Sequence, residues 1–319
     1  MAAQSTLSWQ TGEIVETADA AEGIRRLVIR PDRPVVAPPG SHVDVEVNGL
    51  RRSYSVVRSG NGQWTLSVHL AAASRGGSQA MHALRTGDRL RVSDPLQNFP
   101  LGVGATRYVL LAGGIGITAL LAMGATLKRR GEDYTFVYVG RSRRAMAWLR
   151  ELELEHGERL RVHVDDEGSG LDVGALLSDV HADTELYMCG PIRLMDAVRR
   201  EWAQRGLPPA SLRFETFGNS GAWAAEEFTV SIPSDGRTIT VPKNLSMLEA
   251  LEQAGVEVMW DCRKGECGLC TVRVHEYAGR IDHRDVFLGE GQKTSRICLC
   301  VSRVASDGTS QPELVIDRP

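Results

Sequence analysis

The chain has few cysteines outside one region and no excess of charge of either sign. Of its six cysteines, only Cys189 precedes residue 262, so a disulfide framework is not expected. The net charge of −3 and pI near 6.3 lack the basic character of a nucleic-acid-binding domain. From Met1 to Gln10 there is no basic and then apolar signal-peptide pattern. We therefore expect a cytoplasmic protein.

Charge is also missing from residues 108–127, a stretch long enough to cross a membrane. Its glycines favour another interpretation, namely an apolar strand, a glycine-rich turn and a helix that stops at the basic residues 128–130 and Gly131. With 319 residues, 42% of them hydrophobic, the chain can form two or three domains. A soluble protein of several domains is predicted.

Cysteines near the C-terminus follow the spacing C-x4-C-x2-C and then, much later, C, with Cys262, Cys267 and Cys270 in the first group. This is the plant-type spacing for a [2Fe-2S] cluster, and glycines in the loop allow close turns. A four-thiolate zinc site is the alternative. Zinc motifs usually pair two short C-x2-C clips, whereas the second group here is Cys298-Leu299-Cys300.

The glycine-rich turn in the uncharged stretch contains Gly113, Gly114, Gly116 and Thr118. Glycines let the backbone approach a pyrophosphate, and the following helix presents unpaired N–H groups to it. A standard dinucleotide fingerprint also needs an acid after the next strand. Here the apolar segment 134–139 is followed instead by Gly140 and a segment that contains Arg141, Ser142, Arg143 and Arg144.

That departure, together with Cys189-Gly190-Pro191 and Met195 after a later apolar segment, resembles the nucleotide domain of the ferredoxin-NADP reductase superfamily. The resemblance implies that the two turns flank a nicotinamide, and it implies NADH. Arginines after residue 140 could instead hold the 2′-phosphate of NADPH. The family's usual proline after the threonine is Ala119 here.

Short alternating segments between residues 14 and 100, such as 24–29, 43–47 and 64–70, predict an antiparallel β-barrel. Within it, the sequence Arg52, Ser53, Tyr54, Ser55 matches the R-x-Y-[ST] flavin signature of the same superfamily. The resemblance implies that Arg52 meets the flavin phosphate, that Tyr54 lies beside the ring and that the Ser55 hydroxyl bonds to it.

The turn Arg75-Gly76-Gly77-Ser78 resembles the phosphate-binding turn of the branch that uses FMN, with Val68, His69 and Leu70 beside the flavin. A monophosphate enclosed by charge-assisted hydrogen bonds favours FMN, with FAD as the alternative. The resemblance further implies that Phe217 covers the flavin and that Ser220 touches FMN.

The last hundred residues have the order of a β-grasp ferredoxin: a hairpin at 228–232 and 238–241, then a helix at 246–255 with Ser246 as its N-cap. The ending Cys300-Val301-Ser302-Arg303 resembles ferredoxin domains of the phthalate dioxygenase reductase and vanillate O-demethylase reductase family. By that resemblance Cys300 is the fourth ligand. Cys298 is then a small buried residue on the same strand.

These motifs follow the family's order, which predicts a multidomain chain: an FMN-binding β-barrel at 1–103, a Rossmann-like α/β NAD(P)H domain at 104–222 and a [2Fe-2S] ferredoxin domain at 223–319. Nicotinamide gives two electrons at once and the cluster accepts one, so a flavin must stand between them. The expected protein is a monomeric NADH-dependent reductase serving a Rieske-type aromatic-ring dioxygenase or O-demethylase. Alternatives are a reductase for a cytochrome P450 or other haem monooxygenase, and a non-enzymatic zinc protein.

Overall fold

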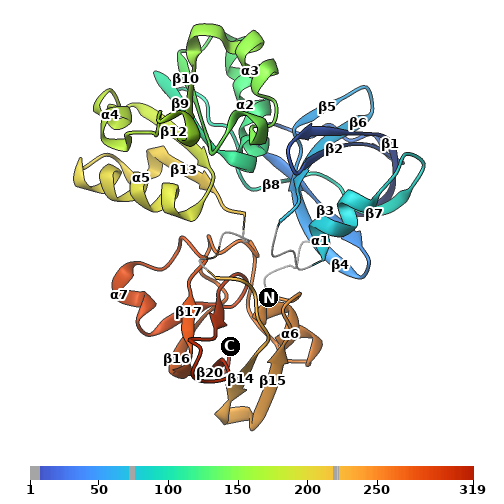
Figure 1. Cartoon of the computed structure of the whole chain (residues 1–319), viewed down its shortest axis with the longest axis vertical. Helices are drawn as coiled ribbons and strands as arrows, with labels where there is room; N and C mark the ends of the chain where they lie inside the picture. The colour runs from blue at the N-terminus through green and yellow to red at the C-terminus, as the bar shows by residue number, and fades with distance from the viewer. Residues whose placement is uncertain (1–7, 72–75, 218–220, 222) are drawn as a thin grey trace. The chain divides into compact units, whose positions relative to one another are not determined.

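The computed structural model describes residues 8–71, 76–217, 221 and 223–319, and they form two compact units (Figure 1). The first unit extends to Glu215 and the second begins at Thr216. The first unit contains both a barrel and an α/β sheet, and the second contains the C-terminal sheets. The boundaries of the three predicted domains stay predictions, and Ala222 lies outside the described residues.

The barrel is an antiparallel sheet with the strand order β4-β3-β7-β1-β2-β6-β5, and β8 pairs with β3. Side chains alternate between its two faces, and Ile14, Leu27 and Trp64 are part of its buried core. The predicted segments 24–29 and 43–47 lie within β2 and β3, and the segment 64–70 lies on β6 and extends one residue beyond its end. The elements are β1 (Trp9–Ala21), β2 (Ile24–Pro31), β3 (Ser41–Val47), β4 (Leu50–Ser55), β5 (Arg58–Gly60), β6 (Gln63–His69), α1 (Gly77–Ala83), β7 (Arg89–Ser93) and β8 (Leu96–Gln97).

The α/β part of this unit is a parallel sheet with the order β11-β10-β9-β12-β13. Its strands are β9 (Arg107–Gly113), β10 (Tyr134–Gly140), β11 (Leu160–Val164), β12 (Thr184–Cys189) and β13 (Leu212–Glu215), and its helices are α2 (Ile117–Arg130), α3 (Leu149–His156), α4 (Val173–Ser178) and α5 (Ile192–Gln204). The strands after β9 are added first on one side of it (β10 and β11) and then on the other (β12 and β13), so the strand order switches direction between β9 and β12. Ligands of such sheets bind at the carboxyl ends of the strands at this switch point.

Trp148 helps to join the barrel to the α/β sheet. Its indole Nε1 donates a hydrogen bond of 3.0 Å to Ser67 Oγ on β6, and the guanidinium of Arg58 lies over its ring at 4.7 Å. Trp148 has a positive φ of 65°, which costs energy for a large side chain. Such a conformation persists only where the surrounding contacts enforce it.

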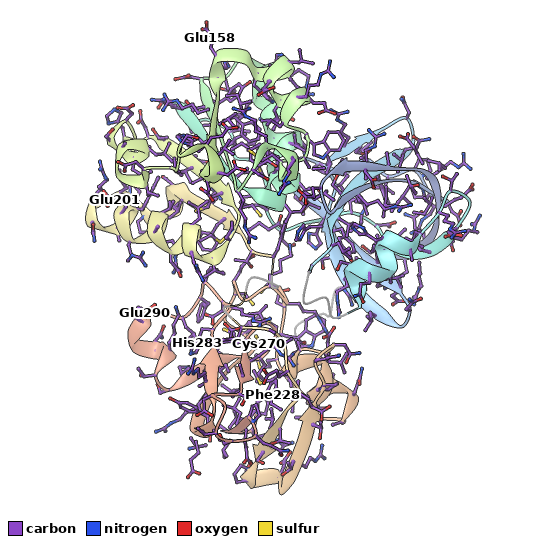
Figure 2. All side chains as sticks on the ribbon, in the orientation of Figure 1. Glu158, Glu201, Phe228, Cys270, His283 and Glu290 are labelled. Atoms are coloured by element: carbon purple, nitrogen blue, oxygen red, sulfur yellow. The ribbon has the colours of Figure 1, made fainter. Side chains whose placement is uncertain are left out.

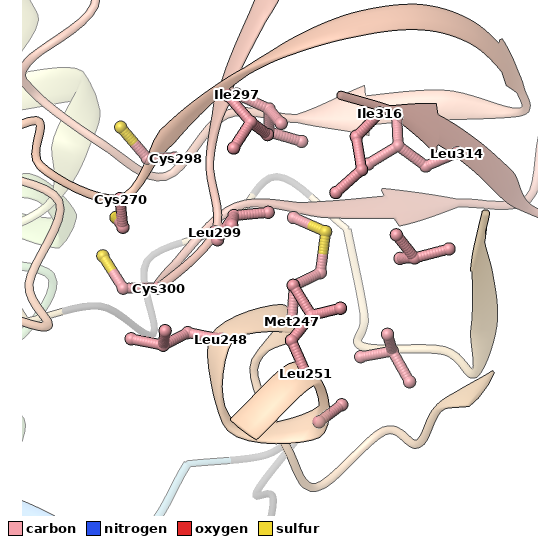
Figure 3. Close-up of a cluster of buried hydrophobic side chains, with 14 of the residues drawn as sticks. Met247, Leu248, Leu251, Cys270, Ile297, Cys298, Leu299, Cys300, Leu314 and Ile316 are labelled. Atoms are coloured by element: carbon pink, nitrogen blue, oxygen red, sulfur yellow. The ribbon is translucent and has the colours of Figure 1, made fainter. Parts of the chain in front are cut away.

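In the second unit, one sheet has the order β15-β14-β20-β16-β18, and β17 pairs with β19. The elements are β14 (Phe228–Ile232), β15 (Arg237–Val241), α6 (Met247–Gln253), β16 (Thr271–Ala278), β17 (Arg280–Asp282), α7 (Glu290–Lys293), β18 (Arg296–Cys298), β19 (Arg303–Ala305) and β20 (Glu313–Ile316). The predicted hairpin is β14 and β15, and the predicted helix is α6. Figure 3 shows Met247 of this helix beside Leu299, and Leu251 belongs to the same apolar core.

The uncharged stretch 108–127 is divided between β9, the glycine-rich turn and α2, as predicted. Helix α2 ends at Gly131, whose left-handed conformation (φ 72°) terminates the helix. Among the residues that the structure describes, no helix combines the length and apolar character needed to cross a membrane.

Candidate functional site

The two predicted nucleotide turns are in direct contact. A Cβ atom on Gly116 would lie 2.1 Å from the Cys189 carbonyl oxygen, and one on Gly113 would lie 2.6 Å from Pro191 Cδ. This proximity follows from the parallel pairing of β9 with β12, in which Ala112 is opposite Cys189. Glycine is therefore required at positions 113 and 116 for packing, at the sheet edge where a ligand is expected.

Gly114 differs from its neighbours because a Cβ atom there would meet nothing within 4 Å, although its φ of 53° favours glycine. Its backbone therefore faces open space beside the start of α2, which suits the close approach of a phosphate. The Thr118 hydroxyl donates 2.9 Å to the Ile115 carbonyl and stabilises this turn. Cys189 and Met195 are fully buried, so their side chains pack in the protein interior next to the two turns.

Two of the three arginines after β10, Arg143 and Arg144, are paired with acids. The Arg143 guanidinium lies 2.8 Å from Glu167 and 3.3 Å from Glu153, and Arg144 lies 2.8 Å from Glu22. Arg141 is exposed and Ser142 half-buried. These carboxylates reduce the positive charge that the arginines could offer to the 2′-phosphate of NADPH.

The flavin signature lies on β4, with Arg52 packed against the predicted phosphate turn. A Cβ atom on Gly77 would lie 2.7 Å from Arg52 Cγ, and Gly76 has a positive φ of 92°. The turn therefore needs its glycines so that the arginine can pass beside helix α1. The structure thus brings together Arg52, Gly76 and Gly77, a cradle suited to a phosphate.

The remaining residues of the signature have separate surroundings. The Ser53 hydroxyl donates 2.5 Å to Asp44 Oδ1, whereas the buried Ser55 hydroxyl lies 3.5 Å from Glu215 Oε2 at the end of β13. Burial raises the pKa of Tyr54 to about 12. Tyr54 is therefore an uncharged phenol at neutral pH, and the contacts of Ser53 and Tyr54 with a cofactor stay predictions.

The end of β6 lies close to the predicted phosphate turn at Gly76 and Gly77 and to the glycine-rich nucleotide turn at Gly114–Gly116. Val68 is buried, and Leu70 is 41% exposed. Desolvation and then the nearby charge of Arg141 lower the pKa of His69, so this ring is neutral at physiological pH. Ser78 Oγ accepts a 3.3 Å bond from the Ala71 N–H.

Two residues of the predicted flavin site, Arg75 and Ser220, lie outside the described residues. Phe217 is half-buried and directly follows Thr216 at the start of the second unit. Its relation to the flavin signature therefore stays a prediction.

The cysteine loop is folded around Cys262. The backbone N–H groups of Lys264, Glu266 and Cys267 each lie 3.4 Å from Cys262 Sγ. A hydrogen bond from Cys300 and these N–H groups lower the pKa of Cys262 to about 5, although burial opposes them. N–H groups directed at sulfur are what an iron-bound thiolate requires, so the loop fits a cluster.

Cys300 interacts with both Cys262 and Cys270, and Cys267 interacts with Cys262. Cys298 interacts with Cys270, and its sulfur lies 3.4 Å from Thr271 Oγ1. In Figure 3, Leu299 points into the apolar core while Cys298 and Cys300 lie on the side of Cys270. Cys300 interacts with two of the other three cysteines of the motif and Cys298 with one, which favours Cys300 as the fourth ligand.

One expectation about these cysteines was wrong. Strand β18 ends at Cys298, and Cys300 lies in the turn that follows, not on the same strand. A turn lets Cys300 face the loop, whereas a continued strand would fix its direction by alternation alone. Within the described ranges, no group of three or more His, Cys, Asp or Glu side chains is arranged to hold a single metal ion.

Two contacts were not foreseen from the sequence. Glu215 meets Ser55 across 160 positions of the chain, and Thr216 bonds to Glu266 beside the cysteine loop. Glu215 belongs to no short motif, Glu266 occupies an unspecified position of the cysteine motif, and no local signal relates residues so far apart. Figure 2 places Cys270 and His283, both labelled, within the second unit.

Comparison with known proteins supports this assembly of motifs. A family described as a 2Fe-2S iron-sulfur cluster binding domain matches residues 230–305. The heme-dependent oxidative N-demethylase beta subunit of Ectopseudomonas mendocina is 37% identical over 83% of this chain and 85% of its own length. The vanillate O-demethylase oxidoreductase of a Pseudomonas species is 35% identical over 87% and 91%.

A solved structure is also similar along nearly the whole chain. Phthalate dioxygenase reductase, described as a modular structure for electron transfer from pyridine nucleotides to [2Fe-2S], has a TM-score of 0.77 and 30% identity over 97% of this chain and 98% of its own. The predicted fold class is thereby confirmed: β-barrel flavin domain, α/β nucleotide domain and plant-type ferredoxin domain.

Fold and site together define a modular flavin and iron-sulfur reductase, an oxidoreductase that transfers electrons from a pyridine nucleotide to a [2Fe-2S] centre. More particularly, the chain belongs to the family of phthalate dioxygenase reductase and vanillate O-demethylase reductase, the reductase subunits of oxygenase and demethylase systems.

Proposed function

We propose that this protein takes electrons from NADH and passes them through FMN and a [2Fe-2S] cluster to the Rieske centre of a separate aromatic-ring dioxygenase or O-demethylase. The cysteine loop carries the proposal, because its N–H groups surround Cys262 Sγ in a chain that also has both nucleotide turns. Family membership supports an oxygenase as the acceptor.

The residues of the chain act by binding and orientation. Arg52 and the turn at Gly76 and Gly77 hold the FMN phosphate, and Tyr54 and Ser55 orient the ring. The turn from Gly113 to Gly116 holds the pyrophosphate of NADH, beside Cys189-Gly190-Pro191. When bound, the flavin supplies the conversion of a two-electron donor to one-electron transfer. No side chain has to serve as acid, base or nucleophile.

Cluster binding is assigned to Cys262, Cys267, Cys270 and Cys300. All six cysteines are free of disulfides, which supports a reducing compartment such as the cytoplasm. The protein acts as a monomer that meets its oxygenase transiently. Plant-type clusters have reduction potentials of about −400 mV and Rieske centres of about −150 mV or above, so electron transfer from the cluster to a Rieske centre is favourable.

NADH is preferred to NADPH. A 2′-phosphate would have to compete with Glu153 and Glu167 for Arg143, and its own charge would be repelled by these acids. Arg144 is engaged by Glu22 in the same way.

A haem protein is the second candidate acceptor. It is favoured by the 37% identity to a heme-dependent N-demethylase subunit. A haem, like a Rieske centre, accepts one electron at a time and therefore suits the same one-electron donor.

Purified protein provides the test. We expect one FMN, two irons and two acid-labile sulfides per chain, and bleaching of both flavin and cluster absorption when NADH is added anaerobically. Turnover with a Rieske oxygenase component and with a haem monooxygenase then separates the acceptors. Absence of iron and sulfide in anaerobically isolated protein would contradict the proposal.

A further inference from the structure

Thr216 is the first residue after β13, and it bonds to the cysteine loop at two points. Its backbone N–H donates 2.6 Å to Glu266 Oε1, and its hydroxyl lies 2.9 Å from the same oxygen. The hydroxyl also lies 2.5 Å from the Lys264 carbonyl oxygen. We call these contacts the Thr216–Glu266 bridge.

Burial strengthens the bridge. Thr216 is 2% exposed and Lys264 is 7% exposed. A hydrogen bond to a charged carboxylate is stronger than one between neutral groups, and a buried N–H left without a partner is costly. The carboxylate of Glu266 therefore determines the position of its own backbone relative to Thr216.

The residues held by the bridge are the ones that bond to Cys262. The N–H groups of Lys264 and Glu266 both lie 3.4 Å from Cys262 Sγ. One residue thus has two roles, because the Glu266 side chain accepts from Thr216 while its backbone donates to sulfur. Movement of the loop away from Thr216 would lengthen both N–H···S contacts.

We propose that Glu266 is a positioning residue for the iron-sulfur centre: its carboxylate, held by Thr216, directs backbone N–H groups at Cys262 and so raises the reduction potential of the cluster. This inference rests on the proposed function, since it requires a cluster on the cysteine loop. Hydrogen bonds to sulfur stabilise the extra negative charge of the reduced state and are an established determinant of such potentials.

The negative charge of Glu266 and its positioning of the N–H groups have opposite effects on the reduction potential of the cluster, so the two effects can be separated. Removing the negative charge of Glu266 raises the potential, whereas losing the N–H···S bonds lowers it. Glu266→Gln removes the charge and keeps an oxygen that accepts from Thr216. Glu266→Ala removes both. The difference between these two variants therefore isolates the bridge.

The experiment measures the midpoint potential of the cluster by EPR-monitored titration, with iron and sulfide content as the check on folding. Asp261→Asn is the matched control, because it removes an exposed carboxylate beside Cys262 without affecting the bridge. We expect Glu266→Ala to lie below Glu266→Gln by about 59 mV, a tenfold change in the equilibrium constant for one electron. Glu266→Gln should resemble Asp261→Asn.

Thr216→Val provides an independent variant, since it keeps the backbone N–H and loses only the hydroxyl. Its potential should fall below that of the wild-type protein, because the charge of Glu266 is kept, and by less than the difference between Glu266→Gln and Glu266→Ala. Equal potentials for Glu266→Ala and Glu266→Gln in cluster-loaded protein would overturn the inference and leave the reductase assignment intact. Wild-type protein without iron and sulfide would instead overturn the assignment itself.

Discussion

At the scale of single residues, the choice of nucleotide depends on how Arg143 is paired. Its guanidinium is shared between Glu153 and Glu167. Replacing both acids with glutamine releases the arginine for a 2′-phosphate and removes the repulsion. Because ion pairs between exposed groups are weak, we expect kcat/KM for NADPH to rise only severalfold.

The measurement is steady-state reduction of ferricyanide with each nucleotide. The value for NADH should change little, because NADH has no 2′-phosphate. A wild-type enzyme that already prefers NADPH would contradict the assignment of NADH.

A second residue-scale prediction concerns Gly77. In Gly77→Ala, the new methyl group would collide with Arg52 Cγ at 2.7 Å and displace the arginine from the proposed phosphate site. We expect flavin content per chain to fall severalfold, measured by absorbance after gel filtration. Gly60→Ala is the control, since a Cβ atom there meets nothing within 4 Å in the same barrel. Unchanged flavin content in Gly77→Ala would argue against this cradle.

At the scale of elements, the contact between the β9 turn and the β12 turn determines the nucleotide site. Gly116→Ala places a methyl group 2.1 Å from the Cys189 carbonyl, and neither backbone can yield easily. Overpacking of this kind costs about 1–3 kcal/mol. We expect KM for NADH to rise by about tenfold while flavin content is retained. Gly170→Ala, where a Cβ atom meets nothing within 4 Å, should leave KM unchanged.

Helix α6 offers an element-scale test of the ferredoxin fold. Ser246 caps it with a complete capping box, in which the Ser246 hydroxyl accepts from the Glu249 N–H and Glu249 bonds back. Ser246→Ala should destabilise the second unit by about 1 kcal/mol, seen as earlier thermal loss of the cluster absorption. The exposed Ser234→Ala should have little effect.

At the scale of the whole molecule, charge is unevenly distributed. Residues 226–319 carry 11 Lys and Arg against 15 Asp and Glu, a net charge of −4, whereas the rest carries 26 against 25, a net charge of +1. A transient complex with a basic patch on the oxygenase should therefore weaken with salt. We expect turnover with the oxygenase to fall severalfold between about 0.05 and 0.5 M NaCl.

Reduction of ferricyanide by NADH serves as the internal comparison, because it needs no protein partner. If oxygenase turnover were independent of salt, the acidic character of this region would be ordinary solubilising charge.

The sequence by itself determined the fold and the chemistry that depends on local order. Strands, helix α2 with its stop at Gly131 and the cap at Ser246 follow from side-chain periodicity and from backbone preferences of a few residues. The C-x4-C-x2-C loop is also local, since its three cysteines lie within nine positions of one another. Such features are encoded by neighbours in the chain, and they could be predicted.

Only the tertiary structure decided which distant residues meet. The contacts of Gly116 with Cys189, of Arg52 with Gly77 and of Thr216 with Glu266 join segments that are 25 to 73 positions apart. The turn that places Cys300 after the end of β18 likewise could not be predicted, because the alternation of side chains along a strand does not show where the strand ends. These contacts depend on strand order and packing of the folded chain, which no short stretch of sequence contains.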